Sequence, residues 1–346
     1  MSVNRRSVLR IGAAGSAALI GAVATPPAAA AVQSATPRQD GQLSDAALVR
    51  LLPGDFRNGY ASVNGTTLHY VTGGEGSPLV LLPGWPETWW QFRKIMPKLA
   101  QHFRVIAVDL RGMNSSGKPA GGYDKKTMAE DIYQLVRRLG HDQVDIAGHD
   151  IGSMVAFSFA ANHPDAIHRL SMMDVAHPDP SLYQLTLLPL PGSEYFLWWF
   201  AFNQVQVLPQ QLLTGRFRHV TDYLCGALLL NQAATDDHSR AIYGDAYDSP
   251  DAIRAGNGWY QTFGQDIIDG QTYPQLTLPL LALYSQGNPS LIQSLAGRAK
   301  NVRPLQISNS GHYLAEEQPD TVAAALISFF NSSQSLDRSG SSVPRR

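Results

Sequence analysis

The sequence predicts an α/β fold: a doubly wound, mostly parallel sheet with an inserted helical lid. Three observations support this prediction. Short apolar runs rich in branched residues, typical of strands buried on both faces, recur along the chain. Amphipathic helical stretches separate these runs, and strands that alternate with helices favour a parallel sheet. From residue 178 to residue 273 the alternation stops, and helical stretches rich in aromatic residues and leucine indicate an insertion.

The first residues have the pattern of an export signal. The twin-arginine motif Asn4-Arg5-Arg6-Ser7 precedes an Ala/Gly-rich apolar run, and small residues end it at Ala31. The run is shorter than the about 20 residues that a membrane span needs. We therefore expect residues 1–31 to be a removed Tat-type signal peptide of a bacterial protein, periplasmic or secreted, without a membrane anchor. A linker is expected over residues 32–55, because residues 32–44 are rich in Gln, Ser, Pro, Asp and Gly and have nothing to bury.

The first part of the sheet domain is predicted over residues 56–177. Two edge strands meet at Asn64-Gly65, a dipeptide typical of hairpin turns. Two buried strands follow, and the first of them ends at the turn Pro83-Gly84-Trp85-Pro86. Residues 127–139 have the spacing of an amphipathic helix, and Gly140 is its stop signal. The same alternation then continues into a third buried strand.

The second part of the sheet domain is predicted over residues 274–331. The strand pattern resumes at residues 279–284 and 303–307, and a helix over residues 321–330 ends the domain. The lid therefore interrupts a single sheet domain. A polar, flexible tail is expected over residues 332–346.

Composition and charge narrow the function. The chain has 346 residues, of which 44% are hydrophobic and 16% charged, as in ordered globular proteins. A net charge of −1 provides no field for nucleic acid or an anionic membrane. Cys225, the one cysteine, lies in an apolar run and is expected to be a small buried side chain. No His, Asp or Glu cluster has metal-ligand spacing, so we expect neither metal nor cofactor.

The stretch from Val144 to Ser153 carries the main candidate for chemistry. A short apolar run leads into Gly148-His149-Asp150-Ile151-Gly152, and an apolar helical stretch follows at once. This is the strand, sharp turn and helix of a nucleophile elbow, where a Cβ at either glycine would crowd the turn. The reacting position holds Asp150. A carboxylate there suits displacement at a saturated carbon, with an ester that must then be hydrolysed.

A general base and its orienting acid are predicted further along the chain. His312 follows a late strand, and a neutral imidazole can take a proton from water near neutral pH. The loop over residues 285–290 contains no carboxylate. Asp174, at the end of the strand after the elbow, is therefore the expected acid that holds His312 in one tautomer. Asp179 is a weaker candidate because it lies between two prolines at the start of the lid.

Together these features resemble the α/β-hydrolase epoxide hydrolases and the haloalkane and haloacid dehalogenases of the same fold. The resemblance extends from about Phe56 to Asn331. It is carried by five features: the Pro83-Gly84-Trp85-Pro86 turn, Asp109-Leu110-Arg111-Gly112, the Gly148-His149-Asp150-Ile151-Gly152 elbow, Asp174, and Gly311-His312. It implies that Asp150 attacks a saturated carbon and that His312, oriented by Asp174, then activates water against the resulting ester.

The resemblance also implies an oxyanion hole. Its donors would be the backbone N–H groups of Ile151 and Trp85. The family pattern opens the turn before Trp85 with His, and this chain has Pro83 there. Backbone donors do not need that side chain, so we expect the hole to remain.

Hydrogen-bond donors in the lid decide whether the leaving group is an alkoxide or a halide. Epoxide hydrolases of this family generally offer two tyrosine hydroxyls, and Tyr260 in Trp259-Tyr260-Gln261 resembles the second of them. The first falls near Trp198 and Trp199, whose indole N–H groups are donors only and suit an alkoxide or a halide alike. Ile151 and Met154 stand where haloacid dehalogenases carry arginines, and haloalkane enzymes have Trp in the place of Ile151, so both positions favour an epoxide.

The leading hypothesis is cofactor-independent hydrolysis of an apolar epoxide by water to a vicinal diol, in a monomer or homodimer. The first alternative is a haloalkane-type dehalogenase. The second is a non-catalytic ligand-binding protein on a hydrolase scaffold, which Pro83 and the unusual position of the acid favour. The intact set of Asp150, Asp174 and His312 argues against this second alternative.

Overall fold

A computed structural model describes residues 43–186, 188–189, 191, 197–286 and 288–332. The expected signal peptide, most of the expected linker and nearly all of the tail lie outside the described residues. Within them, no helix is long and apolar enough to cross a membrane.

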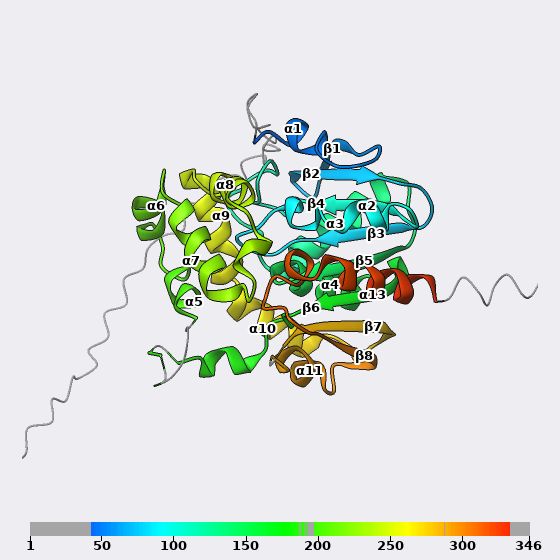
Figure 1. Ribbon diagram of the computed structural model, residues 1–346. Coiled ribbons are helices and arrows are strands. Elements are labelled where there is room, and N and C mark those ends of the chain that lie inside the picture. The colour runs from blue at the N-terminus through cyan, green and yellow to red at the C-terminus, as the bar shows by residue number, and fades with distance from the viewer. Residues whose placement is uncertain (1–42, 187, 190, 192–196, 287, 333–346) are drawn as a thin grey trace, which may run out of the picture. The chain divides into compact units, whose positions relative to one another are not determined.

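The sheet has eight strands in the order β1-β2-β4-β3-β5-β6-β7-β8. The pairs β1–β2 and β2–β4 are antiparallel, and every other pair is parallel, which confirms the predicted mostly parallel sheet. Figure 1 shows the twisted sheet running from β1 to β8. The strands are β1 (Arg57–Val63), β2 (Thr66–Gly73), β3 (Pro78–Leu82), β4 (Arg104–Val108), β5 (Val144–His149), β6 (Ile167–Met173), β7 (Leu276–Ser285) and β8 (Ala299–Ile307).

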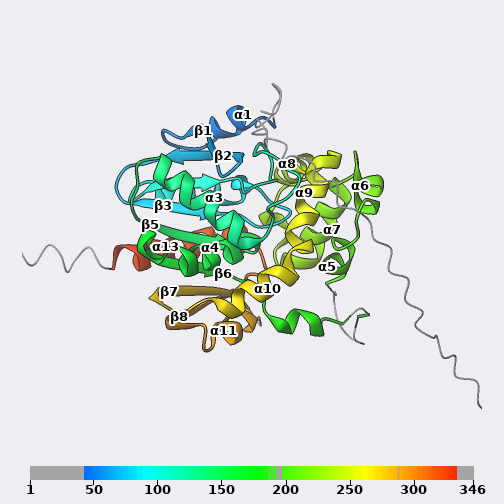
Figure 2. The ribbon, with the colours of Figure 1, turned by 180° about the vertical axis from the view of Figure 1, so that it is seen from behind.

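Each face of the sheet has its own apolar core. Successive side chains of a strand point to opposite faces, so in β3 Val80 and Leu82 join one buried cluster while Leu79 and Leu81 join the other. Helices α3 (Lys125–Arg138) and α4 (Ile151–Asn162) contribute to the first cluster, whereas α2 (Met96–Leu99), α12 (Leu314–Glu317) and α13 (Pro319–Asn331) contribute to the second. The two views in Figures 1 and 2 show α13 and α3 on opposite faces. This is the doubly wound arrangement that the sequence predicts.

The described chain between β6 and β7 contains helices joined by loops and no strand, and its helices gather beyond one end of the strands (Figure 1). We call this group of helices the lid. Short 3-10 turns lie at Pro180–Gln184 and Gln232–Ala234. The lid helices are α5 (Trp198–Phe202), α6 (Leu208–Leu213), α7 (Arg218–Leu228), α8 (Asp237–Ala246), α9 (Pro250–Gln261) and α10 (Phe263–Thr272). A further short helix, α11 (Ser290–Leu295), connects β7 to β8.

The described part of the expected linker is folded. Helix α1 (Asp45–Val49) begins at Ser44, whose side chain accepts a hydrogen bond from the Ala47 N–H group. Leu48 is fully buried. Val49 and Leu52 are buried as well, so apolar side chains of this segment pack on the sheet domain.

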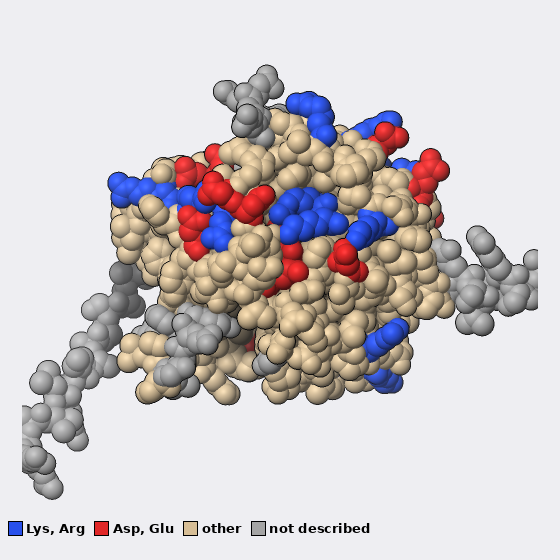
Figure 3. Space-filling model, in the orientation of Figure 1, with Lys and Arg blue, Asp and Glu red and all other residues tan. Residues whose placement is uncertain are grey.

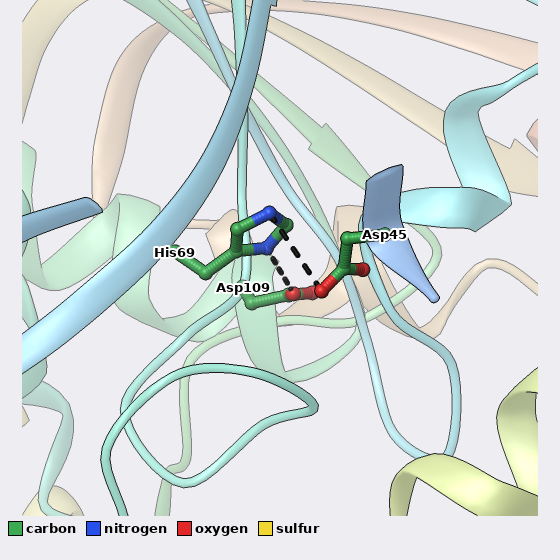
Figure 4. Close-up of side chains that lie close together, drawn as sticks. All are labelled: Asp45, His69 and Asp109. Atoms are coloured by element: carbon green, nitrogen blue, oxygen red, sulfur yellow. Dashed lines mark hydrogen bonds and ion pairs between the residues drawn. The ribbon is translucent and has the colours of Figure 1, made fainter. Parts of the chain in front are cut away.

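A buried ionic cluster fixes α1 to the edge of the sheet (Figure 4). His69 on β2 places Nδ1 2.7 Å from Asp109 Oδ2, and its Nε2 lies 3.8 Å from Asp45 Oδ2. The side chains of Trp89 and Asn114 both donate to Asp45 Oδ1, and Ser115 donates to Asp45 Oδ2. The ligand atoms of Asp45, His69 and Asp109 lie close enough together to share a metal ion. Since N–H and O–H donors already point at the carboxylate oxygens, the cluster is arranged for hydrogen bonds and ion pairs instead.

The cluster predicts a pH-dependent contribution to stability. Burial alone would raise the pKa of Asp45, but the charge of His69 and the hydrogen bonds outweigh it, so the pKa is lowered. A carboxylate with a lowered folded-state pKa stabilises the fold above its unfolded pKa, and this stability is lost as the pH falls through the folded value. Asp45→Asn should reduce the free energy of unfolding by about 1–3 kcal/mol at neutral pH, and the loss should shrink below about pH 4.

Urea unfolding at a series of pH values measures this effect. The matched control is Asp55→Asn, because Asp55 is exposed and lies on the same segment. Equal changes in the two variants would contradict a stabilising role for the cluster.

Candidate active site

The elbow places Asp150 between β5 and α4 in a conformation that few non-glycine residues adopt. Its φ is 50° and its ψ is −120°. A Cβ at Gly152 would collide with the carbonyl oxygen of Leu82, and one at Gly148 would collide with the backbone of Gly152. Both glycines are therefore needed for the backbone contacts of the turn, which confirms the crowding predicted from the sequence.

Backbone donors surround the Asp150 carboxylate. The Trp85 N–H group donates to Asp150 Oδ1 at 2.9 Å, and the Ile151 N–H group also hydrogen-bonds to this carboxylate. Gly84 makes the approach possible, because a Cβ there would collide with the Cβ of Asp150. The two N–H groups expected to form an oxyanion hole thus converge on the side chain at the elbow.

His312 lies between two carboxylates. Its Nδ1 is 2.8 Å from Asp174 Oδ2, and its Nε2 is 3.9 Å from Asp150 Oδ2. Asp174 directly follows β6, and its Oδ1 accepts a hydrogen bond from the Ser285 N–H group at 2.8 Å. The structure therefore brings together all three residues of the predicted set. Asp179 accepts hydrogen bonds from Ser181 and Ser294 instead.

Burial and charge shift the pKa of each member of this set. Burial raises the pKa of Asp150 and outweighs the nearby His312 charge and the two N–H donors. Burial alone would lower the pKa of His312, but the hydrogen bond and charge of Asp174, and the charge of Asp150, raise it above its ordinary value. For Asp174, burial is outweighed by the hydrogen bonds from His312 and Ser285, so its pKa is lowered. Asp174 therefore stays ionised and holds His312 by its Nδ1–H group.

Two of the three predicted lid donors reach the site. Tyr260 and Trp199 line the same cavity as Asp150 and His312. Burial, and then the charge of Asp150, raise the pKa of Tyr260 well above its ordinary value, while a hydrogen bond from Trp199 opposes the shift. Trp198 is not among the residues that line the cavity, and it packs against Phe202 and Tyr223 with ring centroids 5.7 and 5.5 Å away. Tyr260 therefore lies close enough to Asp150 to feel its charge, and the Trp199 N–H group donates to the Tyr260 hydroxyl.

The cavity has a volume of about 720 Å³. Apolar and aromatic side chains form much of its wall, including Trp85, Met154, Trp199, Phe200, Leu224 and Leu228. Hydroxyl and amide side chains also line it, including Ser181, Gln286, Asn288, Ser290 and Ser294. No described lining residue is Lys or Arg. On the face in Figure 3, described basic and acidic side chains are interspersed in one band, so neither sign prevails there.

Several residues of the site could not be recognised from the sequence. The Ser285 N–H group, which holds Asp174, is a backbone donor and has no motif. Gln91 and His149 are buried behind the elbow and hydrogen-bond to each other across 58 positions of the chain. Gly84 was visible in the Pro-Gly-Trp-Pro turn, and a glycine before an expected oxyanion donor is a signal that points to close backbone approach.

Comparisons with known proteins agree with this architecture. The family model described as alpha/beta hydrolase fold matches residues 77–319. The chain is 33% identical over 285 residues to a soluble epoxide hydrolase of Corynebacterium sp. (strain C12), covering 78% of this chain and 96% of that protein. It is 26% identical over 300 residues to a fluoroacetate dehalogenase of Burkholderia sp., covering 81% and 95%. The solved structure of the epoxide hydrolase CorEH without ligand superposes with a TM-score of 0.71 at 32% identity, covering 80% of this chain and 99% of that one.

The geometry of the three residues predicts the titration of His312. Nitrogen-15 NMR of the histidine rings should give a pKa for His312 above about 6.5, because Asp174 and Asp150 both stabilise the imidazolium. Asp174→Asn should lower that pKa, since it removes the hydrogen bond and the charge. His141, on the loop after α3, serves as an internal reference that should titrate alike in both proteins. An unchanged His312 titration in the variant would contradict the ion pair.

Proposed function

The chain belongs to the alpha/beta hydrolase fold family, and from this premise we propose that it opens an apolar epoxide to a vicinal diol through an ester on Asp150. It is a hydrolase, as its epoxide hydrolase and dehalogenase relatives indicate. The observation that carries the proposal is a carboxylate at the elbow, held by the Trp85 N–H group at 2.9 Å and facing His312 at 3.9 Å. A carboxylate attacks saturated carbon and leaves an ester that needs a second, base-assisted step.

In the first step an Asp150 oxygen forms a bond to one carbon of the epoxide. The carbon–oxygen bond of the strained ring breaks, and its electron pair stays on the oxygen. Tyr260 gives its hydroxyl proton to that oxygen, and Trp199 orients Tyr260 through the hydrogen bond between them. The product of this step is a hydroxyalkyl ester of Asp150.

In the second step His312 removes a proton from water, and the hydroxide attacks the ester carbonyl carbon of Asp150. The negative charge that develops on the carbonyl oxygen is stabilised by the N–H groups of Trp85 and Ile151. The ester bond breaks, the departing alkoxide takes the proton from His312, and the diol is released. The proton left on the carboxyl of Asp150 restores the Tyr260 hydroxyl, so one water is consumed per epoxide.

The charge of the cavity favours a neutral substrate. Its described ionisable lining residues are Asp150, Asp174, Asp179, His177, Tyr260 and His312. A carboxylate on the substrate would meet the three acidic groups without a lysine or arginine as partner, which is unfavourable in a buried site. A haloacid is therefore a poor substrate, although one relative is a fluoroacetate dehalogenase.

A haloalkane dehalogenase is the second candidate function. The Trp199–Tyr260 pair favours it, because an indole N–H group beside a hydroxyl resembles a halide site, although binding by both donors requires the Trp199 N–H group to turn from Tyr260 to the halide. Asp150 would displace the halide from carbon, and His312 would hydrolyse the same type of ester. The two functions differ only in what leaves the carbon in the first step.

We also propose that residues 1–31 direct Tat-type export to the periplasm or the medium. The support is the Asn4-Arg5-Arg6-Ser7 motif with its Ala/Gly-rich apolar run. The polar composition up to residue 42 suits a linker between such a signal and α1.

Trapping the ester tests the proposed function. His312→Gln removes the base of the second step, so the Asp150 ester should accumulate when the variant meets an epoxide. Intact-mass measurement should then give an increase equal to the whole epoxide. The matched control is the double variant Asp150→Asn/His312→Gln, which should gain no mass.

Other outcomes of the same measurement separate the alternatives. An increase equal to an alkyl group without its halogen, with epoxides unreactive, would establish the dehalogenase. An inert unmutated protein, together with no adduct from a broad panel, would contradict both enzymes and favour a ligand-binding protein.

Tyr260→Phe tests the proton donor of the first step. Loss of one donor to a developing oxyanion costs about 10²- to 10³-fold in rate, so kcat/KM for epoxides should fall within this range. Tyr223→Phe is the matched control, because Tyr223 lies on α7 and packs on Trp198 outside the cavity lining. Equal kinetics of Tyr260→Phe and the unmutated enzyme, measured by diol formation, would exclude Tyr260 as the donor.

A further inference from the structure

We infer that Gln91 and His149 are positioning residues that couple the oxyanion turn to the base loop, and that they serve the hydrolysis of the ester more than its formation. This inference rests on the proposed function. It is carried by three hydrogen bonds, of which Gln91–His149 and His149–His312 join segments far apart in the sequence. Neither Gln91 nor His149 lines the cavity, so both act through residues that do.

The first hydrogen bond holds the turn. Gln91 Oε1 accepts from the Gly84 N–H group at 2.9 Å, and the next N–H group along the chain, that of Trp85, donates to Asp150 Oδ1. Gly84 itself lies so close to Asp150 that a Cβ would collide with it. Fixing the Gly84 peptide therefore fixes the direction of the Trp85 donor.

The other two hydrogen bonds extend to the base. Gln91 Nε2 lies 3.1 Å from His149 Nδ1, and His149 Nε2 lies 2.9 Å from the carbonyl oxygen of His312. His149 directly precedes Asp150 in the chain, so its ring is attached to the elbow. The three bonds thus join the turn, the elbow and the base loop into one unit.

The directions of the three bonds are mutually determined. A carbonyl oxygen only accepts, so His149 carries its proton on Nε2 and leaves Nδ1 as an acceptor. Gln91 must then present its NH₂ group to Nδ1, which turns Oε1 toward the Gly84 N–H group. A flipped amide would set two donors against each other. Glu87 Oε2, at 3.8 Å from His149 Nδ1, is too far to compete as a hydrogen-bond partner.

Burial supports a rigid, neutral unit. Gln91 and His149 are each 2% exposed. Burial, and then the charge of His312, lower the pKa of His149 to about 3, which keeps its ring neutral at ordinary pH. Buried polar networks in which every member is satisfied favour one arrangement of their parts.

The two chemical steps depend on this unit differently. Attack on the epoxide needs the Asp150 oxygen and the lid donors. Hydrolysis needs the Trp85 N–H group and the His312 imidazole at the same time, on either side of one ester carbonyl. A displacement between turn and base loop therefore slows the second step in particular, and a misplacement of about 1 Å costs about 10²-fold.

Gln91→Leu tests the inference by the partition between the two steps. We expect ester hydrolysis to slow by about 10- to 100-fold, with little change in the rate of ester formation. The ester should accumulate during turnover and be visible by intact mass. Because kcat/KM ends at the formation of the ester, kcat and KM should fall together and their ratio should change little. A purely structural loss would lower the amount of active enzyme and leave KM unchanged.

Gln134→Leu is the matched control. Gln134 also bridges two partners, accepting from the Asn64 N–H group at 2.7 Å and donating to Glu130 at 2.7 Å, but on α3 and outside the cavity lining. It should leave KM and the ester level unchanged. The inference would be overturned if Gln91→Leu and Gln134→Leu had the same ratio of ester hydrolysis to ester formation while the unmutated enzyme is active on epoxides. An inert unmutated enzyme and no adduct on His312→Gln would instead overturn the proposed function.

A second variant and a second measurement apply if Gln91→Leu does not fold. In Gln91→Glu the carboxylate keeps the bond from Gly84 but loses the donor to His149, so the ester should accumulate to a smaller extent. Hydrolysis at the unmutated rate would overturn the inference. Nitrogen-15 NMR of the unmutated enzyme should identify His149 as the neutral Nε2–H tautomer, and the Nδ1–H tautomer would overturn it.

Discussion

The close backbone contact at the elbow is the constraint on which the rest of the site depends. Asp150 has a φ of 50°, and residues held in such sparsely populated conformations cost on the order of 1–3 kcal/mol each. The sheet supplies what holds it there: β3 lies beside β5, so the end of β3 and the following turn come against the elbow. Only glycine fits at positions 84 and 152, where a side chain would meet Asp150 or Leu82. The position of the nucleophile therefore depends on both the strand order and the glycine turn after β3.

Much of this arrangement could be predicted because it follows from order along the chain. Asp150 and Asp174 each follow a strand that the sequence marks by its apolar run, His312 follows the later strand β8, and parallel strands bring their carboxyl ends to one edge of the sheet. That they also lie close together depends on the order β5-β6-β7-β8, which places their strands near one another. The spatial order itself, with β4 placed between β2 and β3, has no local signal.

What escaped prediction depends on contacts across the chain. Trp198 and Trp199 are adjacent, and successive residues of a helix point about 100° apart. Without the rotation of α5 the sequence could not decide between them, and only Trp199 lines the cavity. Helix α1 is five residues long, too short to produce a periodic pattern. The hydrogen bond between Gln91 and His149 forms only in the tertiary structure. A glutamine near an aromatic turn has no spacing that would indicate such a partner.

The position of His312 between two carboxylates gives the proposed reaction an internal order. Asp174 is the closer partner, at 2.8 Å against 3.9 Å for Asp150, and both raise the pKa of His312. In the proposed first step Tyr260 gives up its proton, so the negative charge of Asp150 passes to the Tyr260 oxygen when the ester forms. The carboxylate 3.9 Å from His312 then becomes a neutral ester, while Asp174 at 2.8 Å remains ionised beside the ring. Because Asp174 is already bound to Nδ1, Nε2 stays directed at the ester, where water must lose its proton.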